Sequence, residues 1–122
     1  MIKNFLLVGL GGGIGSMLRF GTALLINNKL FPYATFAVNI IGCFIIGVVF
    51  ALSFKEGALS NNWKVFLTAG ICGGFTTFSA FSLENMELLQ SGKYGMAIAY
   101  IGLSIILGIG ATFLGYQLLI KN

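Results

Sequence analysis

The sequence predicts an all-α membrane protein with four transmembrane helices, the third of which is broken. Of the 122 residues, 57% are hydrophobic and 8% are charged, whereas soluble domains carry about 25% charged residues. Four apolar segments each approach the ~20 residues that a helix needs to cross a bilayer. The third segment contains two adjacent glycines, each of which weakens a helix by about 1 kcal/mol relative to alanine, followed by two β-branched threonines.

The first apolar segment runs from about Phe5 to Ile26. A secretory signal peptide would be shorter and would end at a small-residue cleavage site, whereas this segment continues into Arg19. We therefore interpret it as the first membrane span. Its glycine-rich run GLGGGIG, residues 9–15, is not a dinucleotide-binding loop, because the G-x-G-x-x-G spacing, a preceding strand and a following acidic residue are all missing.

Three further apolar segments follow, separated by short polar connectors. The second span is predicted from about Tyr33 to Phe54, the third from about Trp63 to Leu89, and the fourth from about Met96 to Ile120. The connectors at residues 55–62 and 90–94 contain Gly, Ser and Asn, which favour turns. Since no room remains for a soluble domain, we expect a single four-helix transmembrane domain over residues 1–122.

Positive charge is nearly balanced between the two ends of the predicted helices. With four spans, one side carries Lys3, Lys55, Lys64 and Lys121, and the other carries Lys29, Lys93 and Arg19. Because loop lysines and arginines normally set orientation, such a chain is expected to insert both ways and to form an antiparallel, dual-topology homodimer. The alternative is a single orientation set by Lys3.

Small residues four positions apart let membrane helices approach closely. The chain holds three such pairs, which are Gly9/Gly13, Gly11/Gly15 and Gly70/Gly74. The sequence leaves open whether they pack within one subunit or between two.

Composition excludes several classes of function. Histidine and aspartate are both absent, which removes most metal-centre, triad and acid–base chemistry, so the chain is not expected to be an enzyme. The net charge of +4 arises from seven basic and three acidic residues, and the basic residues are too few and too scattered for nucleic-acid binding. Cys43 and Cys72 lie in apolar runs, match no zinc or redox motif, and are expected to pack as small hydrophobic residues.

The segment GGFTTFSAFS, residues 73–82, carries the strongest functional signal. Each unpaired backbone group in hydrocarbon costs several kcal/mol, so a broken helix persists there only where it is buried in protein or lines a watery path. Backbone groups freed at membrane depth are used for ion sites in channels and transporters. The break therefore predicts a protein that moves or binds a small ion.

Polar residues within the other spans are further candidates. Arg19 would cost about 2.5–3.5 kcal/mol at a helix centre, unless its side chain extends to the interface. The amide of Asn39 offers donors to an anion, with a hydrogen bond between helices as the alternative. Tyr100 and Ser104 stand four positions apart and share a helix face, where they could form a polar track.

Two phenylalanines follow the predicted break. Phe78 and Phe81 lie three positions apart on one face, flanked by Thr77, Ser79 and Ser82. Their ring edges carry positive potential and can face an anion, although aromatic stripes more often pack in a core. Glu84 lies one turn after Phe81, and its role stays open between hydrogen bonding and helix positioning.

Along its whole length the chain resembles the CrcB/Fluc family of fluoride channels. The matching features are residues 12–19, VNIIG at residues 38–42, GGFTTFSAFS-x-E at residues 73–84, and Tyr100 with Ser104. The third motif is long and specific. One departure is Ala80, where the family commonly has threonine.

The resemblance implies an antiparallel homodimer with two fluoride pores, which exports fluoride passively from the cytoplasm across a bacterial inner membrane. It also implies a structural sodium ion at the dimer interface, which is not transported and is held by the backbone carbonyls of Gly73 and Thr76. The family's pore phenylalanines correspond to Phe78 and Phe81, its pore asparagine to Asn39 and its vestibule arginine to Arg19. The predicted fluoride pore comprises Asn39, Phe78, Phe81, Thr77, Ser79, Ser82, Tyr100, Ser104 and Arg19.

Two alternative classes of protein fit parts of the pattern. A four-helix multidrug or cation transporter would carry a carboxylate in its first helix, where this chain has Arg19 and no acid. A small accessory membrane protein would explain the glycines but not the broken third span.

Overall fold

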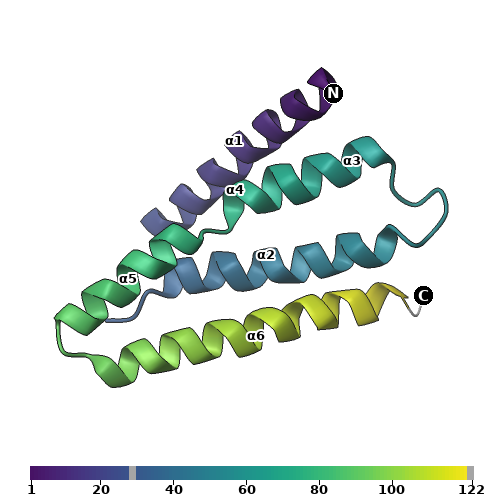
Figure 1. Cartoon of the computed structure of the whole chain (residues 1–122). Coiled ribbons are helices and arrows are strands. Elements are labelled where there is room, and N and C mark those ends of the chain that lie inside the picture. The colour runs from purple at the N-terminus through teal and green to yellow at the C-terminus, as the bar shows by residue number, and fades with distance from the viewer. Residues whose placement is uncertain (28–29, 121–122) are drawn as a thin grey trace.

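The computed structural model describes residues 1–27 and 30–120, and the described part contains helices and connecting turns (Figure 1). Lys29 and Lys121, which entered the comparison of loop charges, lie outside the described residues. The helices are α1 (Ile2–Leu25), α2 (Tyr33–Leu52), α3 (Asn61–Val65), the π-helix η1 (Phe66–Cys72), α4 (Gly73–Phe75), α5 (Phe78–Gln90) and α6 (Tyr94–Ile120).

Within the described residues, four helical stretches are long and apolar enough to cross a membrane, which confirms the four predicted spans. Elements α3, η1, α4 and α5 follow one another and together form the third, bent stretch from Asn61 to Gln90. Both termini and the α2–α3 connection lie at one end of the molecule, and the α1–α2 and α5–α6 connections lie at the other (Figure 1). The spans therefore cross alternately in opposite directions.

Turn residues and caps explain where the helices begin and end. Gly57 and Gly92 have positive φ angles of 77° and 76°, a backbone conformation that glycine adopts without steric cost. Gly57 lies between α2 and α3, and Gly92 lies between α5 and α6. At the start of α3 the Ser60 hydroxyl accepts a hydrogen bond from the backbone N–H of Trp63, at 3.3 Å.

Glycines bring the helices into close contact within the subunit. A Cβ atom added to Gly11 would lie 2.7 Å from the carbonyl oxygen of Phe66, and one added to Gly74 would collide with the backbone of Gly12. Gly15 likewise approaches the backbone of Ile71. Nothing lies within 4 Å of a Cβ atom added to Gly9 or Gly13. Two of the three small-residue pairs therefore pack inside the subunit, while Gly9/Gly13 faces open space.

The break in the third span lies after the glycine pair rather than at it. Gly73 and Gly74 are helical, whereas Thr76 (φ −82°, ψ 157°) and Thr77 (φ −152°, ψ 120°) are extended. The break predicted for residues 73–82 is therefore confirmed, but the glycine pair in it is helical and the interruption falls on the two threonines. Gly74 instead permits the contact with α1, and the β-branched threonines occupy the extended conformation that suits them.

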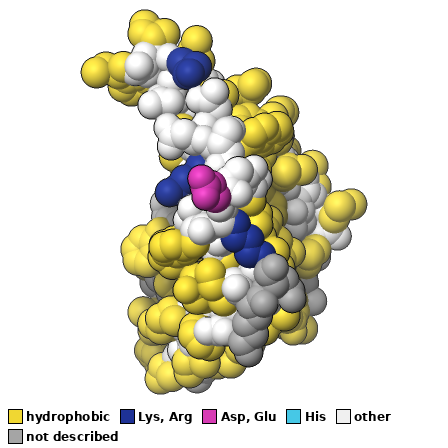
Figure 2. Space-filling view, turned by 90° about the vertical axis from the view of Figure 1, so that its right-hand side faces the viewer, with side chains coloured by type: hydrophobic (Ala, Val, Ile, Leu, Met, Phe, Trp, Pro, Cys, Tyr) yellow, Lys and Arg dark blue, Asp and Glu magenta, His cyan; other side chains and the backbone are white. Residues whose placement is uncertain are grey.

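The exterior of the subunit is strongly apolar. Large hydrophobic side chains are exposed on every span, and the buried apolar set is small: Val38, Val49, Ala51, Cys72, Ala97 and Tyr100. Figure 2 looks onto the end that holds both termini and shows a few charged side chains among predominantly apolar ones. Such a surface requires lipid or another subunit around it.

Candidate functional site

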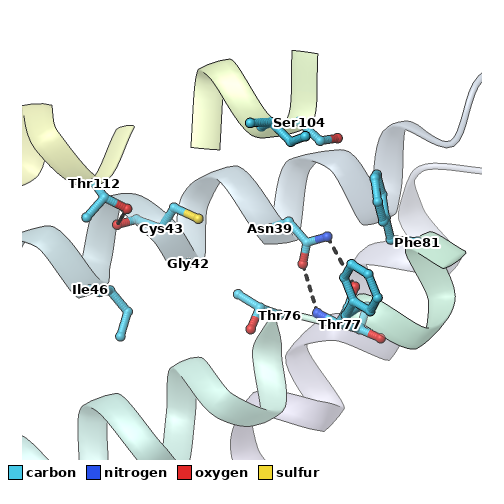
Figure 3. Close-up of a pocket in the computed structure, with 11 residues that line it drawn as sticks. Asn39, Gly42, Cys43, Ile46, Thr76, Thr77, Phe81, Ser104 and Thr112 are labelled. Carbon is cyan, nitrogen blue, oxygen red and sulfur yellow. Dashed lines mark hydrogen bonds between the residues drawn. The ribbon is translucent and has the colours of Figure 1, made fainter. Parts of the chain in front are cut away.

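The extended residue Thr77 is held by the side chain of Asn39 (Figure 3). The backbone N–H of Thr77 donates to Asn39 Oδ1 at 2.8 Å, and Asn39 Nδ2 donates to the carbonyl oxygen of Thr77 at 3.2 Å. The amide thus satisfies both backbone groups of a residue that lies outside any helix. Since an amide nitrogen carries two hydrogens, one N–H of Asn39 is left for another acceptor.

Local hydroxyl groups form further hydrogen bonds at the break. The Thr77 hydroxyl accepts a hydrogen bond from the backbone N–H of Ala80 at 3.2 Å and so caps α5. The Thr76 hydroxyl donates to the Cys72 carbonyl at 2.8 Å. Thr77 and Ser79 hydroxyls lie 3.2 Å apart. Protein side chains therefore satisfy part of the interrupted backbone.

Arg19 reaches the break from α1. Its Nε donates to the carbonyl oxygen of Gly74 at 3.0 Å, and the side chain is half-buried. In an unbroken helix the N–H of Phe78 would donate to that carbonyl. Arg19 lines a separate cleft of about 160 Å³ together with Thr35, Ala80 and Glu84, among others. The structure thus places Arg19 beside the break and outside the larger cavity described next.

A cavity of about 360 Å³ lies beside the break, between α2, α6 and the start of α5 (Figure 3). Six residues singled out from the sequence line it: Asn39, Thr76, Thr77, Phe78, Phe81 and Ser104. It is also lined by Gly42, Cys43, Ile46, Ile105 and Thr112. Neither Cys43 nor Thr112 was expected to line a pore. Helical spacing could have found both, because Cys43 follows Asn39 by four positions and Thr112 follows Ser104 by eight.

Aromatic rings form one end of the cavity. The centroids of Phe78 and Phe81 lie 5.7 Å apart, and those of Phe81 and Tyr100 lie 4.9 Å apart with an edge-on geometry. Phe78 is 78% exposed, whereas Tyr100 is fully buried. The phenylalanine rings therefore stay accessible at the cavity, while the buried ring of Tyr100 packs against Phe81.

Glu84 ties together three spans through two short hydrogen bonds. The Thr35 hydroxyl of α2 donates to Oε2 at 2.6 Å, and the Tyr100 hydroxyl of α6 donates to Oε1 at 2.8 Å. Of the two roles left open for Glu84, the geometry places it as a hydrogen-bond acceptor. A tyrosine hydroxyl has one hydrogen to donate, and in Tyr100 this hydrogen is used in the bond to Glu84. The Tyr100 oxygen can therefore only accept further hydrogen bonds.

The other predicted site residues are distributed around the break. The buried hydroxyl oxygen of Ser104 has no hydrogen-bond partner in the part of the chain that the structure describes. Ser79 and Ser82 are exposed and do not line the cavity, and Gly73 is exposed as well. The N–H of Thr77, which would pair with the Gly73 carbonyl in a continuous helix, donates to Asn39 instead.

Comparison with known proteins assigns the chain to a family. The family model described as CrcB-like protein, Camphor Resistance (CrcB), matches residues 6–116. The chain belongs to the CrcB family. This confirms the resemblance found in the sequence motifs, and with its four spans the CrcB-family chain is a multi-pass membrane protein.

Curated relatives of this CrcB-family chain match it nearly end to end. A protein named fluoride-specific ion channel FluC from Azobacteroides pseudotrichonymphae genomovar. CFP2 is 51% identical over 121 residues, covering 97% of each chain. A protein of the same name from Flavobacterium psychrophilum is 50% identical and covers 93% of this chain and 94% of its own. Another, from Thermus thermophilus, is 47% identical and covers 96% of this chain and 95% of its own.

Proposed function

We propose that the chain is a fluoride-specific ion channel. The observation that carries the proposal is the cavity beside the broken third span, where neutral donors and accessible phenylalanine rings come together. The relatives named fluoride-specific ion channel support it, since they match this chain at about half of all positions over nearly its full length. The prediction that the chain is not an enzyme is confirmed by its membership of a family whose curated relatives are ion channels.

The chemistry of the cavity suits fluoride. An unpaired ion taken into a low-dielectric interior costs tens of kcal/mol by Born estimates, so the path must replace its hydration shell. The remaining N–H of Asn39 and the Ser104 hydroxyl are neutral donors, and the edges of Phe78 and Phe81 carry positive potential. Neutral groups bind weakly enough for the ion to leave again, as conduction requires.

The proposal includes an antiparallel, dual-topology homodimer in a bacterial inner membrane. The extensive apolar exterior and the open face at Gly9 and Gly13 support a second subunit. Adding two lysines to residues 55–62 should fix one orientation. Such a variant should conduct poorly alone and recover when it is expressed with an oppositely biased one. Full activity of a uniformly oriented population would contradict the antiparallel dimer.

A structural sodium ion at the dimer interface is also proposed, held by the carbonyls of Gly73 and Thr76. The break supports this, because Thr77 N–H is bonded to Asn39 and does not occupy the Gly73 carbonyl. Two subunits related by a twofold axis would present these oxygens twice. Replacing sodium exhaustively by a large organic cation should abolish fluoride flux. Unchanged flux would contradict the sodium site but leave the proposed fluoride pore intact.

The function is tested by fluoride efflux from liposomes that contain the purified protein. Liposomes loaded with potassium fluoride should release fluoride rapidly once valinomycin lets potassium follow, and a fluoride electrode records the release. Protein-free liposomes and a parallel chloride load are the controls. Slow release equal to that of the protein-free liposomes, or equally fast release of chloride, would contradict a fluoride-specific channel.

A further inference from the structure

One face of α6 carries a series of polar residues with a gap. Tyr100, Ser104, Gly108 and Thr112 stand four positions apart and therefore lie along the same side of the helix. Three of the four carry a hydroxyl group, and Gly108 carries none. The gap falls between Ser104 and Thr112, both of which line the cavity beside the break.

The thiol of Cys43 on α2 lies at this gap. A Cβ atom added to Gly108 would lie 3.5 Å from Cys43 Sγ and 3.9 Å from Ile40 Cδ1. Cys43 lines the same cavity as Ser104 and Thr112 (Figure 3). Because Gly108 has no side chain, the space beside the Cys43 sulfur stays open. The sulfur therefore lies where a hydroxyl group at position 108 would stand between those of Ser104 and Thr112.

The donors along this wall are scarce. The Tyr100 hydroxyl donates its hydrogen bond to Glu84. The Thr112 hydroxyl donates to the carbonyl of Cys43 at 3.0 Å or to that of Gly108 at 3.2 Å. The buried Ser104 oxygen, in contrast, has no partner among the described residues, and the Cys43 thiol is a free thiol that forms no disulfide with them. Ser104 and Cys43 are therefore the hydroxyl and thiol groups on this wall that have a proton to offer an ion.

We propose that the Cys43 thiol is a pore-lining hydrogen-bond donor that takes the place left empty at Gly108. The inference rests on the proposed channel function and adds a residue to its ion path. A thiol is a neutral and weak S–H donor, so it stabilises a passing anion without holding it. It also makes the path reactive toward thiol reagents.

The second cysteine provides a matched control. Cys72 is 2% exposed, does not line the cavity, and its sulfur lies 3.9 Å from the Gly42 carbonyl oxygen. Cys43 and Cys72 share chemistry and membrane depth but differ in access to the cavity. A reagent that acts through the pore should therefore distinguish them.

The first test treats the full-length protein in liposomes with methyl methanethiosulfonate, which transfers a methylthio group to a thiol and releases methanesulfinate. Fluoride efflux of the unaltered protein and of Cys72→Ala should fall at least about fivefold on treatment, because the added group fills the path. Cys43→Ser should keep its own untreated rate. Equal inhibition of Cys43→Ser, or no inhibition of the unaltered protein, would overturn the proposal.

The second test separates a donor from a packing residue. Cys43→Ala should reduce efflux about fivefold, the effect of losing one modest hydrogen bond. Adding Gly108→Ser to that variant should restore efflux, since it returns a hydroxyl to the same place and meets only ordinary contacts. Failure of the second substitution to restore efflux would show that Cys43 merely packs. Absence of fluoride efflux from the unaltered protein would instead contradict the channel function itself.

Discussion

Two helix pairs in this molecule use the same kind of contact for different purposes. In the pair α2–α6, a Cβ atom on Gly47 would collide with the Thr112 carbonyl, and one on Gly115 would collide with the Phe44 carbonyl. In the pair formed by α1 with η1 and α4, Gly11 and Gly74 make equally close backbone contacts. Glycine thus sets the distance between helices in both pairs.

The pairs differ in what else they need. Helices α2 and α6 are continuous, and the hydroxyl of Thr112 bridges them with a hydrogen bond to the backbone carbonyl of Cys43. The third span is interrupted, and both Arg19 and Asn39 must satisfy its backbone. Small residues therefore suffice to pack intact membrane helices. Where the backbone hydrogen bonds of a helix are interrupted, polar side chains from neighbouring spans are needed as well.

The largest expected effect tests what the two pairs have in common. Gly11→Ala and Gly47→Ala should each destabilise the protein by about 1–3 kcal/mol, because the added methyl group meets backbone that cannot move aside cheaply. Gly9→Ala is the control, since nothing lies within 4 Å of its Cβ position. Thermal unfolding in detergent and the yield of monodisperse protein measure the effect. Equal behaviour of all three variants would contradict close packing within the subunit.

The next effect tests the polar support of the break. Asn39→Ala removes both hydrogen bonds to Thr77 and leaves a part-buried N–H and C=O that water can still reach, at about 1–2 kcal/mol in all. We expect fluoride efflux to fall at least about tenfold, with weaker stability. Efflux from liposomes and unfolding in detergent are measured together. A variant with unaltered efflux would show that the break holds its shape without Asn39.

A smaller effect separates geometry from charge at Arg19. Arg19→Lys keeps the positive charge but loses the planar guanidinium whose Nε donates to Gly74. If the hydrogen bond matters, Arg19→Lys and Arg19→Gln should lose similar stability, about 1 kcal/mol. Should Arg19→Lys match the unaltered protein while Arg19→Gln fails, attraction of anions by charge would be the better account. The readouts are unfolding in detergent and efflux at two ionic strengths.

The smallest effect belongs to the continuous pair. Thr112→Val removes the hydroxyl that donates to Cys43 and Gly108 but keeps the shape of the side chain. Hydrogen bonds between membrane helices contribute about 0.6 kcal/mol on average, so the loss should stay below about 1 kcal/mol. Unfolding in detergent measures it. A loss as large as that of Asn39→Ala would remove the distinction between the two helix pairs.

The sequence predicted the spans well and the break less well, for a physical reason. Long apolar runs set the spans, because burial in lipid depends on local composition alone. The position of the break depends on Asn39, which lies 38 residues before Thr77 and pairs with it only in the folded chain. Glycine content indicated a weak point, but the tertiary hydrogen bonds decided that Thr76 and Thr77 would be extended.

The candidate site followed the same rule. Residues on one motif, such as Thr77, Phe78 and Phe81, were found together because helical spacing brings them together. The contacts of Glu84 with Thr35 and Tyr100 join residues 49 and 16 positions away, which no local pattern reveals. Assignment of ion contacts to each predicted residue stays a prediction for the efflux measurements.

The π-helix η1 has a consequence for which changes in chain length the protein can tolerate. A π-helical hydrogen bond spans five residues where an α-helical one spans four, so residues 66–72 hold more chain per turn than an α-helix would. Deleting one residue there would let the segment close as an ordinary α-helix, so the residues after it would keep their direction. Gly74 would then still face Gly12 across the contact with α1. Single-residue deletions should therefore be tolerated in this segment in functional homologues, whereas an added residue would turn all that follows by about 100° and should be found instead in the connection around Gly57.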